Sequence, residues 1–561
     1  MKCLLVAVFA GVVAGCSGAQ EPLPATTAPP RLVVLCAVDQ LAAWVFDQAQ
    51  PHFADDGGFR RLLRDGAQFA KCEYEHACTE TGPGHATIAT GVPARVHGIV
   101  RNKWWVPKLG AAIYCVDEPM APLPDLPEGR NRGAGLLLAP TLATLLKANV
   151  PGSLAASVSW KDRSAIMMAG PKADLALWCE ATTGRFVTNT AWVRQTPPWL
   201  LALHAEAPID RLFGTVWTRT GPDSAYVGLV DDRPYETPHA NGSNARTLPQ
   251  PLTGGEAKPG LPFYNQIYAS PFGNTVVRLA AEATVRGMQL GADATPDLLC
   301  VSFSSTDVIG HGFGPDSVEA RDGLLRLDRE LATFLQFLDS QVGKGQWAMF
   351  LTADHGVGPT PEWARAQGLD AGRGLIQTMV GAAAEKVLAD ALGPPPARKR
   401  YLAHIGEYSV FFHDAVLDAV RGDRELDDVR LEAARIVAVV APNVRGIAAA
   451  FATEDLLAAG GAPDALRRSL VDALCEGRAG DVQLVIKPNW LDGATPASHG
   501  TPHAYDREVI GLAFGPGVPA GSRVAATVTP GFGAVWFAQL LGLPRLPHST
   551  DVVPASLSNA R

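Results

Sequence analysis

The chain has 561 residues, a hydrophobic content of 47% and a formal net charge of −8. This length exceeds one small domain, and the apolar content is sufficient for a large core, so global disorder is excluded. The acidic balance lacks the basic footprint of a nucleic-acid-binding protein, so no nucleic-acid partner is expected.

The N-terminus has the pattern of a secretion signal. A Met-Lys start precedes an apolar run over residues 4–13, which is too short to span a bilayer, and Val-Ala-Gly-Cys then ends at Cys16. The pattern is similar to a bacterial lipoprotein cleavage site and predicts a signal peptide over 1–15 and lipidation of Cys16; an ordinary signal peptide is the alternative. Residues 16–30 form a Pro-rich tether. We therefore expect a secreted, periplasmic or outer-membrane protein whose only membrane contact is its lipid anchor.

The chain contains nine cysteines, of which Cys3 and Cys16 belong to the signal region. Cys36 and Cys300 lie inside apolar runs and are expected to be packed thiols. In an oxidising compartment the remaining five are candidates for disulfides, with at least one of the seven left free and no pairing specified by the sequence. These five are Cys72, Cys78, Cys115, Cys179 and Cys475.

Three apolar runs read as buried parallel strands that end at acidic or imidazole side chains. Open α/β sheets bind ligands at the carboxyl ends of their strands, so these side chains are expected to meet at one sheet edge. The runs are 32–38, ending at Asp39; 298–303, ending near Asp307; and 347–353, ending at Asp354 and His355.

The rest of the chain suggests one α/β core with an insertion. A strand over 154–160 leads into Lys161-Asp162-Arg163, and residues 171–290 are expected to be loops and short strands that cover the ligand edge of the sheet. Apolar residues at helical spacing predict a helix over 324–338. From 366 to 487 helices and strands alternate, which predicts an inserted α+β module. The core is then 31–365 together with 488–557.

The segment over 79–91, Thr-Glu-Thr-Gly-Pro-Gly-His-Ala-Thr-Ile-Ala-Thr-Gly, holds the hydroxyl group that we expect the acids to surround, Thr81. The residues 82–84 predict a tight turn into a helix, whose free N–H groups favour an anion.

Six side chains form a candidate ligand set for two zinc-like cations. Asp307 and His311 are four residues apart and share one face of a helical turn. Each motif alone has an ordinary structural explanation, and the prediction depends on their joint occurrence at strand ends and Gly-flanked loops. The set is Asp39, Asp307, His311, Asp354, His355 and His499. Four other histidines are expected to be structural, with His503 the most plausible exception: His76, His85, His97 and His503.

Two divalent ions about 4 Å apart can stabilise the attacking and leaving oxygens of a phosphoryl transfer together. One of them lowers the pKa of a hydroxyl group, so that Thr81 attacks as an alkoxide. Lys161 and Arg163 supply positive charge for the remaining phosphate oxygens.

At this point several motifs together resemble one family, the phosphate-insensitive (PafA-type) alkaline phosphatases of the alkaline phosphatase superfamily. The motifs are Val-Asp-Gln at 38–40, Thr-Glu-Thr-Gly-Pro-Gly-His-Ala-Thr at 79–87, His-Gly-Ile-Val-Arg-Asn at 97–102, Lys-Asp-Arg at 161–163, Ser-Pro-Phe-Gly-Asn-Thr at 270–275, Ser-Thr-Asp-Val-Ile-Gly-His at 305–311, Thr-Ala-Asp-His-Gly at 352–356 and His-Gly-Thr-Pro-His at 499–503.

The resemblance implies an alkaline-phosphatase-like α/β core, with a mostly parallel sheet flanked by helices, and a two-zinc phosphomonoesterase whose nucleophile is Thr81. It implies broad use of small phosphomonoesters, and it leaves the oligomeric state open. By motif position, Asp39, Thr81, Asp354 and His355 hold one zinc; Asp307, His311 and His499 hold the other; and Asn102, Lys161 and Arg163 bind phosphate oxygens.

Two other functions remain as alternatives. A phosphodiesterase of the same superfamily is disfavoured by the Lys161–Arg163 pair, because a diester monoanion needs less positive charge. An inactive phosphate-binding surface protein is disfavoured by the complete ligand set and the intact Thr81.

Overall fold

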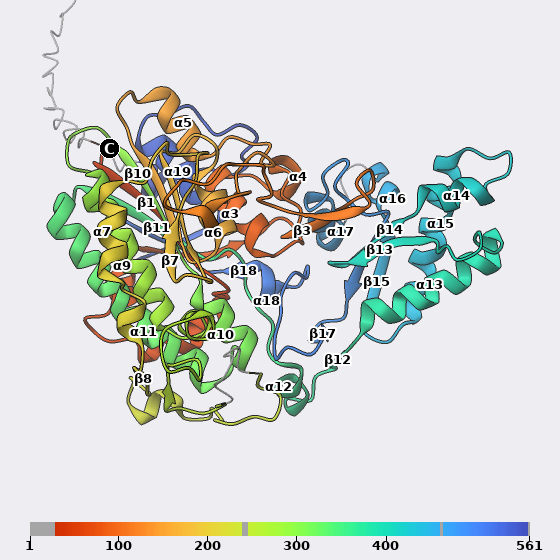
Figure 1. The fold of residues 1–561 in the computed structure, drawn as a ribbon, viewed down its shortest axis with the longest axis horizontal. Coiled ribbons are helices and arrows are strands. Elements are labelled where there is room, and N and C mark those ends of the chain that lie inside the picture. The colour runs from red at the N-terminus through yellow and green to blue at the C-terminus, as the bar shows by residue number, and fades with distance from the viewer. Residues whose placement is uncertain (1–28, 238–244, 460–463, 559–561) are drawn as a thin grey trace, which may run out of the picture.

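The computed structural model describes residues 29–237, 245–459 and 464–558. The predicted signal peptide, the lipidation site Cys16 and most of the tether lie outside these residues. A ten-stranded mixed sheet forms the centre of the larger body (Figure 1). Its strands are β1 (Leu32–Val38), β2 (Ala67–Glu73), β5 (Ala155–Ser159), β6 (Leu175–Glu180), β7 (Arg185–Val187), β10 (Asp297–Phe303), β11 (Trp347–Thr352), β18 (Glu508–Val509), β19 (Leu512–Phe514) and β20 (Ser522–Val528).

The sheet runs in the order β18-β2-β19-β11-β1-β10-β5-β6-β7, with β20 beside β2. Its central strands β11, β1, β10, β5 and β6 are all parallel, while β19 and β7 join them antiparallel. Every residue of β1 is buried, as expected for a strand covered on both faces. The predicted α/β class with a mostly parallel sheet is confirmed.

Helices cover both faces of this sheet (Figure 1). On one face α9 (Phe272–Met288) packs against α11 (Val318–Leu338), and on the other α3 (Thr81–Thr90) packs against α6 (Asp162–Ala169) and α19 (Phe532–Leu540). The apolar stripe predicted for 324–338 is the buried face of α11. Because helices cover both faces of the sheet, a ligand-binding site is expected at the carboxyl ends of the parallel strands.

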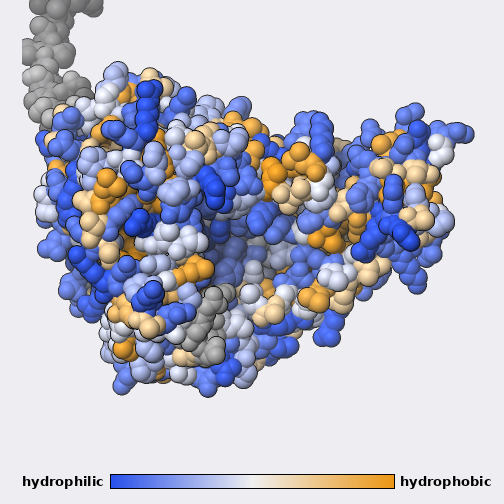
Figure 2. Space-filling view, in the orientation of Figure 1, coloured by the Kyte–Doolittle hydropathy of each residue, from blue (hydrophilic) through white to orange (hydrophobic). Residues whose placement is uncertain are grey.

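A second, smaller body carries its own sheet and its own hydrophobic cluster. The sheet has the order β13-β14-β16-β15, and α13 and α15 pack together beside it. Figure 2 shows a hollow lined with hydrophilic residues between the two bodies. The boundaries 365/366 and 487/488 stay a prediction. The elements are α13 (Ile376–Leu392), β13 (Leu402–Gly406), β14 (Ser409–Phe412), α15 (Leu426–Val440), β15 (Ile447–Ala452) and β16 (Val482–Ile486).

The prediction of loops and short strands over 171–290 is wrong for much of this segment. It contains β6, which lies inside the central sheet, and three helices, of which α9 has 17 residues. Small residues such as Ala280 and Ala281 form much of the buried face of α9, so its helical period was weak in the sequence. The other two helices are α7 (Pro198–Glu206) and α8 (Leu261–Tyr268).

The candidate cysteines form no disulfide in the part of the chain that the structure describes. All seven cysteines there are free thiols, and six of them are buried. Burial raises the pKa of the Cys78 thiol to about 12, which keeps it protonated and unreactive. These thiols are Cys36, Cys72, Cys78, Cys115, Cys179, Cys300 and Cys475.

Candidate active site and metal centre

The ends of three parallel strands bring the predicted acids together. Val38 of β1 is level with Phe303 of β10, and Ala37 is level with Thr352 of β11. Asp39 and Asp354 therefore emerge side by side, and Asp307 follows from the first turn of α10 (Ser305–Phe313). All three carboxylates are buried, with exposed fractions of 4% or less.

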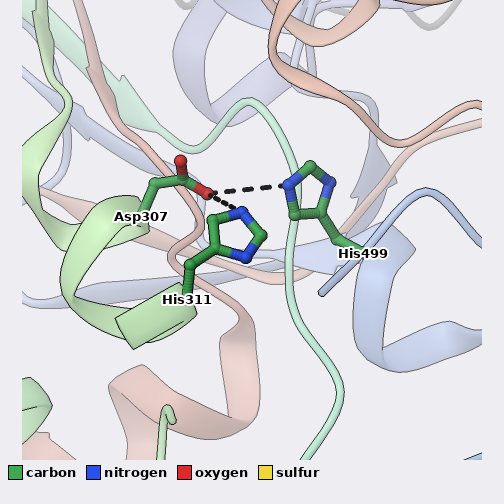
Figure 3. Close-up of side chains that lie close together, drawn as sticks. All are labelled: Asp307, His311 and His499. Carbon is green, nitrogen blue, oxygen red and sulfur yellow. Dashed lines mark ion pairs between the residues drawn. The ribbon is translucent and has the colours of Figure 1, made fainter. Parts of the chain in front are cut away.

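Asp307, His311 and His499 form the first ligand group (Figure 3). The Nε2 atoms of His311 and His499 lie 3.2 and 3.6 Å from Oδ1 of Asp307. Asp307 and His311 come from one face of α10, and His499 approaches from the loop before α18 (Ala504–Arg507). Their ligand atoms all lie within 4.8 Å of one another, which suits a single metal ion.

A second ligand group lies around Nε2 of His355 and also contains Asp39 and Asp354. Nε2 of His355 lies 3.4 Å from Oδ1 of Asp39 and 3.4 Å from Oδ2 of Asp354. These three buried atoms have no hydrogen-bond partner among the described residues. Asp307 also faces this group, because an oxygen of it lies within 4.8 Å of ligand atoms of Asp39 and His355.

Hydrogen bonds to backbone carbonyls fix the tautomer of all three ligand histidines. Nδ1 donates to the carbonyl oxygen of Ala497 at 2.9 Å in His311, of Gly356 at 3.0 Å in His355 and of Thr79 at 2.7 Å in His499. A carbonyl can only accept, so Nδ1 carries the proton and Nε2 presents a lone pair. Such a bond on the far nitrogen is what orients a metal-binding imidazole.

The electrostatics of the site match a cation-binding role. Burial lowers the pKa of His499 to about 3 and holds the pKa of His355 well below its usual range, so both rings are neutral. Burial raises the pKa of Asp39 to about 6, and the charge of Asp307 adds to this effect. Burial also raises the pKa of Asp354 well above its ordinary value, and the charge of Asp39 adds to it. Neutral imidazoles and mutually repelling carboxylates fit bound divalent cations.

Thr81 opens α3 beside both groups, and its side chain is buried. Its Oγ1 accepts hydrogen bonds from Nζ of Lys161 at 3.2 Å and from Nη2 of Arg163 at 3.3 Å. Lys161 also donates to Asp39 and to Asp307, each at 2.6 Å. The Thr81 hydroxyl group therefore shares one network of contacts with the two positively charged side chains, Lys161 and Arg163. Lys161 extends this network to Asp39 and Asp307.

Close packing explains the glycine three residues after Thr81. A Cβ atom at Gly84 would lie 1.9 Å from the carbonyl oxygen of Asp354, so only glycine lets α3 approach the backbone that follows β11.

Asn102 lies next to the start of α3, but its contact differs from the expected one. Its Oδ1 accepts from the backbone N–H of Gly82 at 2.7 Å, and Gly84 N donates to the carbonyl of Glu80. The predicted free N–H groups of this turn are thus partly used by the protein. The bond from Gly82 uses only the amide oxygen of Asn102. The two N–H donors on Nδ2 are on the other arm of the amide and can bind an anion.

The sequence did not indicate two residues that hold this site in place. The side-chain amide of Gln40 donates to Oδ1 of Asp307 at 2.7 Å, and its backbone N–H donates to Oδ1 of Asp354 at 3.1 Å. Tyr114 accepts from Arg163 at 3.3 Å and donates to Asp162 at 2.5 Å. Gln40 follows directly after Asp39, which is the only signal that could have identified it.

The four other histidines singled out in the sequence all contact groups of the protein itself. His85 bridges the carbonyl of Thr81 at 2.8 Å and the hydroxyl of Ser302 at 2.7 Å. His76 and His97 both contact Oγ1 of Thr87 at 3.1 Å. His503, the predicted exception, bonds the carbonyl of Ile486 at 2.9 Å and belongs to neither ligand group.

Comparison with known proteins gives a consistent result. The family described as type I phosphodiesterase / nucleotide pyrophosphatase matches residues 33–491. The chain is 30% identical over 524 residues to alkaline phosphatase PafA of Elizabethkingia meningoseptica, covering 91% of each protein. It is also 30% identical over 505 residues to alkaline phosphatase PhoV of Synechococcus elongatus, covering 89% of this chain and 88% of PhoV.

The fold agrees with these sequence matches. The crystal structure of wild-type PafA superposes with a TM-score of 0.83 and 28% identity, covering 92% of this chain and 97% of PafA. The chain therefore belongs to the type I phosphodiesterase / nucleotide pyrophosphatase family, among its PafA-type alkaline phosphatases.

Proposed function

We propose that the chain is a metal-dependent hydrolase of phosphate monoesters that acts through a phosphothreonine at Thr81 and releases inorganic phosphate. The observation that carries this proposal is the position of the Thr81 hydroxyl, which is held by Lys161 and Arg163 next to two converging ligand groups. The family relatives named alkaline phosphatases support the same class of reaction.

The donor atoms of the site suit two zinc ions. Imidazole nitrogens with carboxylate oxygens are a common zinc ligand set, and the unpartnered atoms of Asp39, Asp354 and His355 fit the fold only with a cation or protons among them. When bound, such ions supply Lewis acidity that lowers the pKa of an adjacent hydroxyl group. We assign Asp39, Thr81, Asp354 and His355 to one zinc, and Asp307, His311 and His499 to the other.

The protein residues do the rest of the chemistry. Oγ1 of Thr81 attacks phosphorus and the alcohol leaves from the opposite side; water then attacks the phosphothreonine in a second in-line step. Arg163, Lys161 and Nδ2 of Asn102 hold the non-bridging oxygens and their charge through both steps. Tyr114 and Asp162 keep the Arg163 guanidinium in place.

Small organophosphates of many kinds are the proposed substrates, because the hollow between the two bodies is open and hydrophilic (Figure 2). A phosphodiesterase remains the second candidate, since the matching family is named for that activity. The Lys161–Arg163 pair favours the monoester, whose dianion needs the additional charge. Turnover of an aryl phosphate compared with the bis-aryl phosphate decides between the two: a diester preference of orders of magnitude would overturn the proposal.

We also propose secretion and lipid anchoring through the N-terminal 1–16 segment. Within the described residues, the structure contains no helix with the length and apolarity needed to cross a bilayer. Cys16→Ser should therefore move the expressed protein from the membrane fraction to the soluble secreted fraction. Unchanged membrane retention of the variant would contradict the anchor but leave the catalytic proposal intact.

The catalytic proposal is tested with Thr81→Ala and Thr81→Ser. We expect Thr81→Ala to lower kcat for an aryl phosphate by about 10³-fold or more. We expect Thr81→Ser to retain part of the activity, because it keeps a hydroxyl group. Metal content, measured on the same samples by mass spectrometry, separates loss of the nucleophile from loss of the ions. Unchanged turnover and metal content in Thr81→Ala would end the proposal.

A further inference from the structure

A strained turn joins β13 to β14 in the second body. Gly406 of β13 pairs with Ser409 of β14, so Glu407 and Tyr408 are the two residues of the turn. Their φ angles are 50° and 58°, and positive values at both positions are the pattern of a type I′ turn. Such turns favour Asn-Gly, because bulky side chains are strained in the left-handed region. The fold therefore keeps a glutamate and a tyrosine where another pair of residues would be less strained.

The second body fixes the backbone of Tyr408 on both sides. The N–H of Tyr408 donates to Oε1 of Gln377 at 2.9 Å, and its carbonyl oxygen accepts from the N–H of Leu484 at 2.8 Å. Strained backbone persists where the surrounding structure imposes it, and it occurs preferentially at functional sites. The side chain of Tyr408, in contrast to its backbone, contacts the larger body.

Two segments of the larger body contact the Tyr408 ring. The guanidinium carbon of Arg101 lies over the ring, 5.7 Å from its centroid, which is a cation–π distance. The ring also approaches Gly500, where a Cβ atom would lie 3.5 Å from Cε2 of Tyr408. Tyr408 thus packs against the residue before Asn102 and the residue after His499.

Arg101 connects these two segments to a third. Its Nη1 donates to Oε1 of Glu80 at 2.9 Å and to the carbonyl oxygen of Gly500 at 3.2 Å. The side chains of Arg101 and Glu80 are only 12% and 5% exposed, so water competes little for this ion pair. Through Oε2, Glu80 also accepts from the backbone N–H of Asn102 at 2.7 Å. One guanidinium group therefore joins three parts of the chain that are distant in sequence.

Each of the three joined points lies next to a group of the proposed chemistry. Glu80 precedes Thr81, and Gly500 follows His499. Asn102 is itself a proposed phosphate-binding residue. A displacement of about 1 Å at such positions can lower the rate by about 10²-fold. The position of the guanidinium group therefore affects the nucleophile, a phosphate contact and a metal ligand together.

We propose that Tyr408 is a positioning residue of the active site, although it belongs to the second body. Its ring holds the guanidinium group of Arg101 where it bonds Glu80 and Gly500, and the strained turn presents the ring at that point. The second body is thereby part of the catalytic unit. The expected effect on turnover rests on the proposed function, whereas the expected effect on zinc affinity is measured without turnover.

Variants of the turn separate holding Arg101 from filling space. Tyr408→Phe keeps the ring face, and Tyr408→Leu keeps apolar bulk without it. The turn variant, Glu407→Asn with Tyr408→Gly, removes the ring but has the sequence that this turn prefers. Phe337→Leu is the matched control, because it removes a ring that lies 4.6 Å from the guanidinium carbon of Arg286 in the last turn of α11.

Three quantities are measured on the purified full chain: kcat/KM for an aryl phosphate, zinc affinity by competition with a chelator, and Tm. Arg101→Ala and the double variant of Arg101→Ala with Tyr408→Leu complete a double-mutant cycle. The cycle shows whether the ring acts through the guanidinium group, because two residues that act as one unit give losses that do not add.

We expect Tyr408→Phe and Phe337→Leu to keep about half or more of the wild-type kcat/KM, and Tyr408→Leu to lower it about tenfold. Zinc affinity of Tyr408→Leu should fall about threefold or more. In the Arg101→Ala background, Tyr408→Leu should add a loss of about twofold at most. The turn variant should have the low kcat/KM of Tyr408→Leu but a higher Tm, because its turn is unstrained.

Three results would overturn the role of Tyr408: a loss in Tyr408→Phe as large as in Tyr408→Leu, wild-type turnover and zinc affinity in Tyr408→Leu, or additive losses in the cycle. If Tyr408→Leu does not fold, the turn variant carries the same prediction for kcat/KM and zinc affinity. A wild type that binds zinc but does not hydrolyse the ester would overturn the proposed function, while the zinc affinities would still decide the role of Tyr408.

Discussion

Nζ of Lys161 lies 3.2 Å from Oγ1 of Thr81 and at the same time contacts Asp39 and Asp307, each at 2.6 Å. One ammonium group thus connects the proposed nucleophile to a ligand of each proposed metal ion. The counter-charges hold the pKa of Lys161 above its usual value in spite of burial. Together with Arg163, Lys161 places two permanent positive charges at the reacting oxygen.

This arrangement predicts that an Arg163→Ala variant loses more activity toward a phosphate monoester than toward a phosphate diester. The monoester dianion loses a fork of two donors, so its kcat/KM should fall by about 10²–10³-fold, while that of a diester monoanion should fall much less. Arg163→Lys keeps the positive charge but not the two parallel donors, so its kcat/KM for the monoester should lie between those of wild type and Arg163→Ala. An equal loss for both substrates would show that Arg163 supports the site without recognising the dianion.

Gln40 predicts an effect on metal affinity. Its amide donates to Asp307 at 2.7 Å, and its backbone holds Asp354 at 3.1 Å, so one residue orients ligands of both groups. Gln40→Ala removes only the side-chain contact. We expect weaker zinc binding by about 10–100-fold, measured by competition with a chelator. If metal affinity were unchanged while activity fell, Gln40 would act on the substrate and not on the ligands.

Tyr114→Phe removes one oxygen that links Arg163 to Asp162. The guanidinium then loses a fixed neighbour, and we expect kcat/KM for a monoester to fall by about tenfold with unchanged metal content. Tyr401→Phe is the matched control, because it deletes a hydroxyl group bonded to Gly393 in the second body, far along the chain from the site. Equal effects of the two variants would contradict a positioning role for Tyr114.

Asp506 predicts a difference in the pH dependence of stability. It is fully buried, burial raises its pKa to about 8, and its Oδ2 accepts from the N–H and the hydroxyl of Thr501. Because the folded state keeps this proton above the pH at which the unfolded chain releases it, the contribution is present at low pH and is lost between about pH 4 and pH 8.

Asp506→Asn cannot lose that proton. Relative to wild type, the variant should therefore gain stability as pH rises through this window, by at most about 1.4 kcal/mol per pH unit. Urea unfolding of both proteins at several pH values, with the same metal loading, measures the difference. Parallel stability curves for the two proteins would show that Asp506 is ionised in the folded state.

Much of the core sheet was predictable because its central strands are buried on both faces and read as unbroken apolar runs that end at Asp39, Asp307 and Asp354. Strand β2 alternates between buried and exposed residues around Lys71, which is a weaker signal, and the sequence did not reveal it. Helix α9 was missed because its buried face is built largely from small side chains.

The convergence of the six proposed ligands near Thr81 could be predicted because each lies after a recognisable strand or within a Gly-flanked motif. The contacts of Gln40 and Tyr114 could not be predicted, since they join residues that are 267 and 48 positions apart in the chain. The five candidate cysteines form no disulfide, because compartment chemistry alone does not bring two sulfur atoms together and the fold leaves these thiols apart.

The stereochemistry of transfer tests the central claim most directly. A phosphate monoester made chiral at phosphorus with oxygen isotopes is turned over in the presence of an acceptor alcohol, and the configuration of the transferred phosphoryl group is determined. Two in-line displacements through Thr81 predict net retention. Net inversion would show direct attack by the acceptor and would contradict a phosphothreonine intermediate.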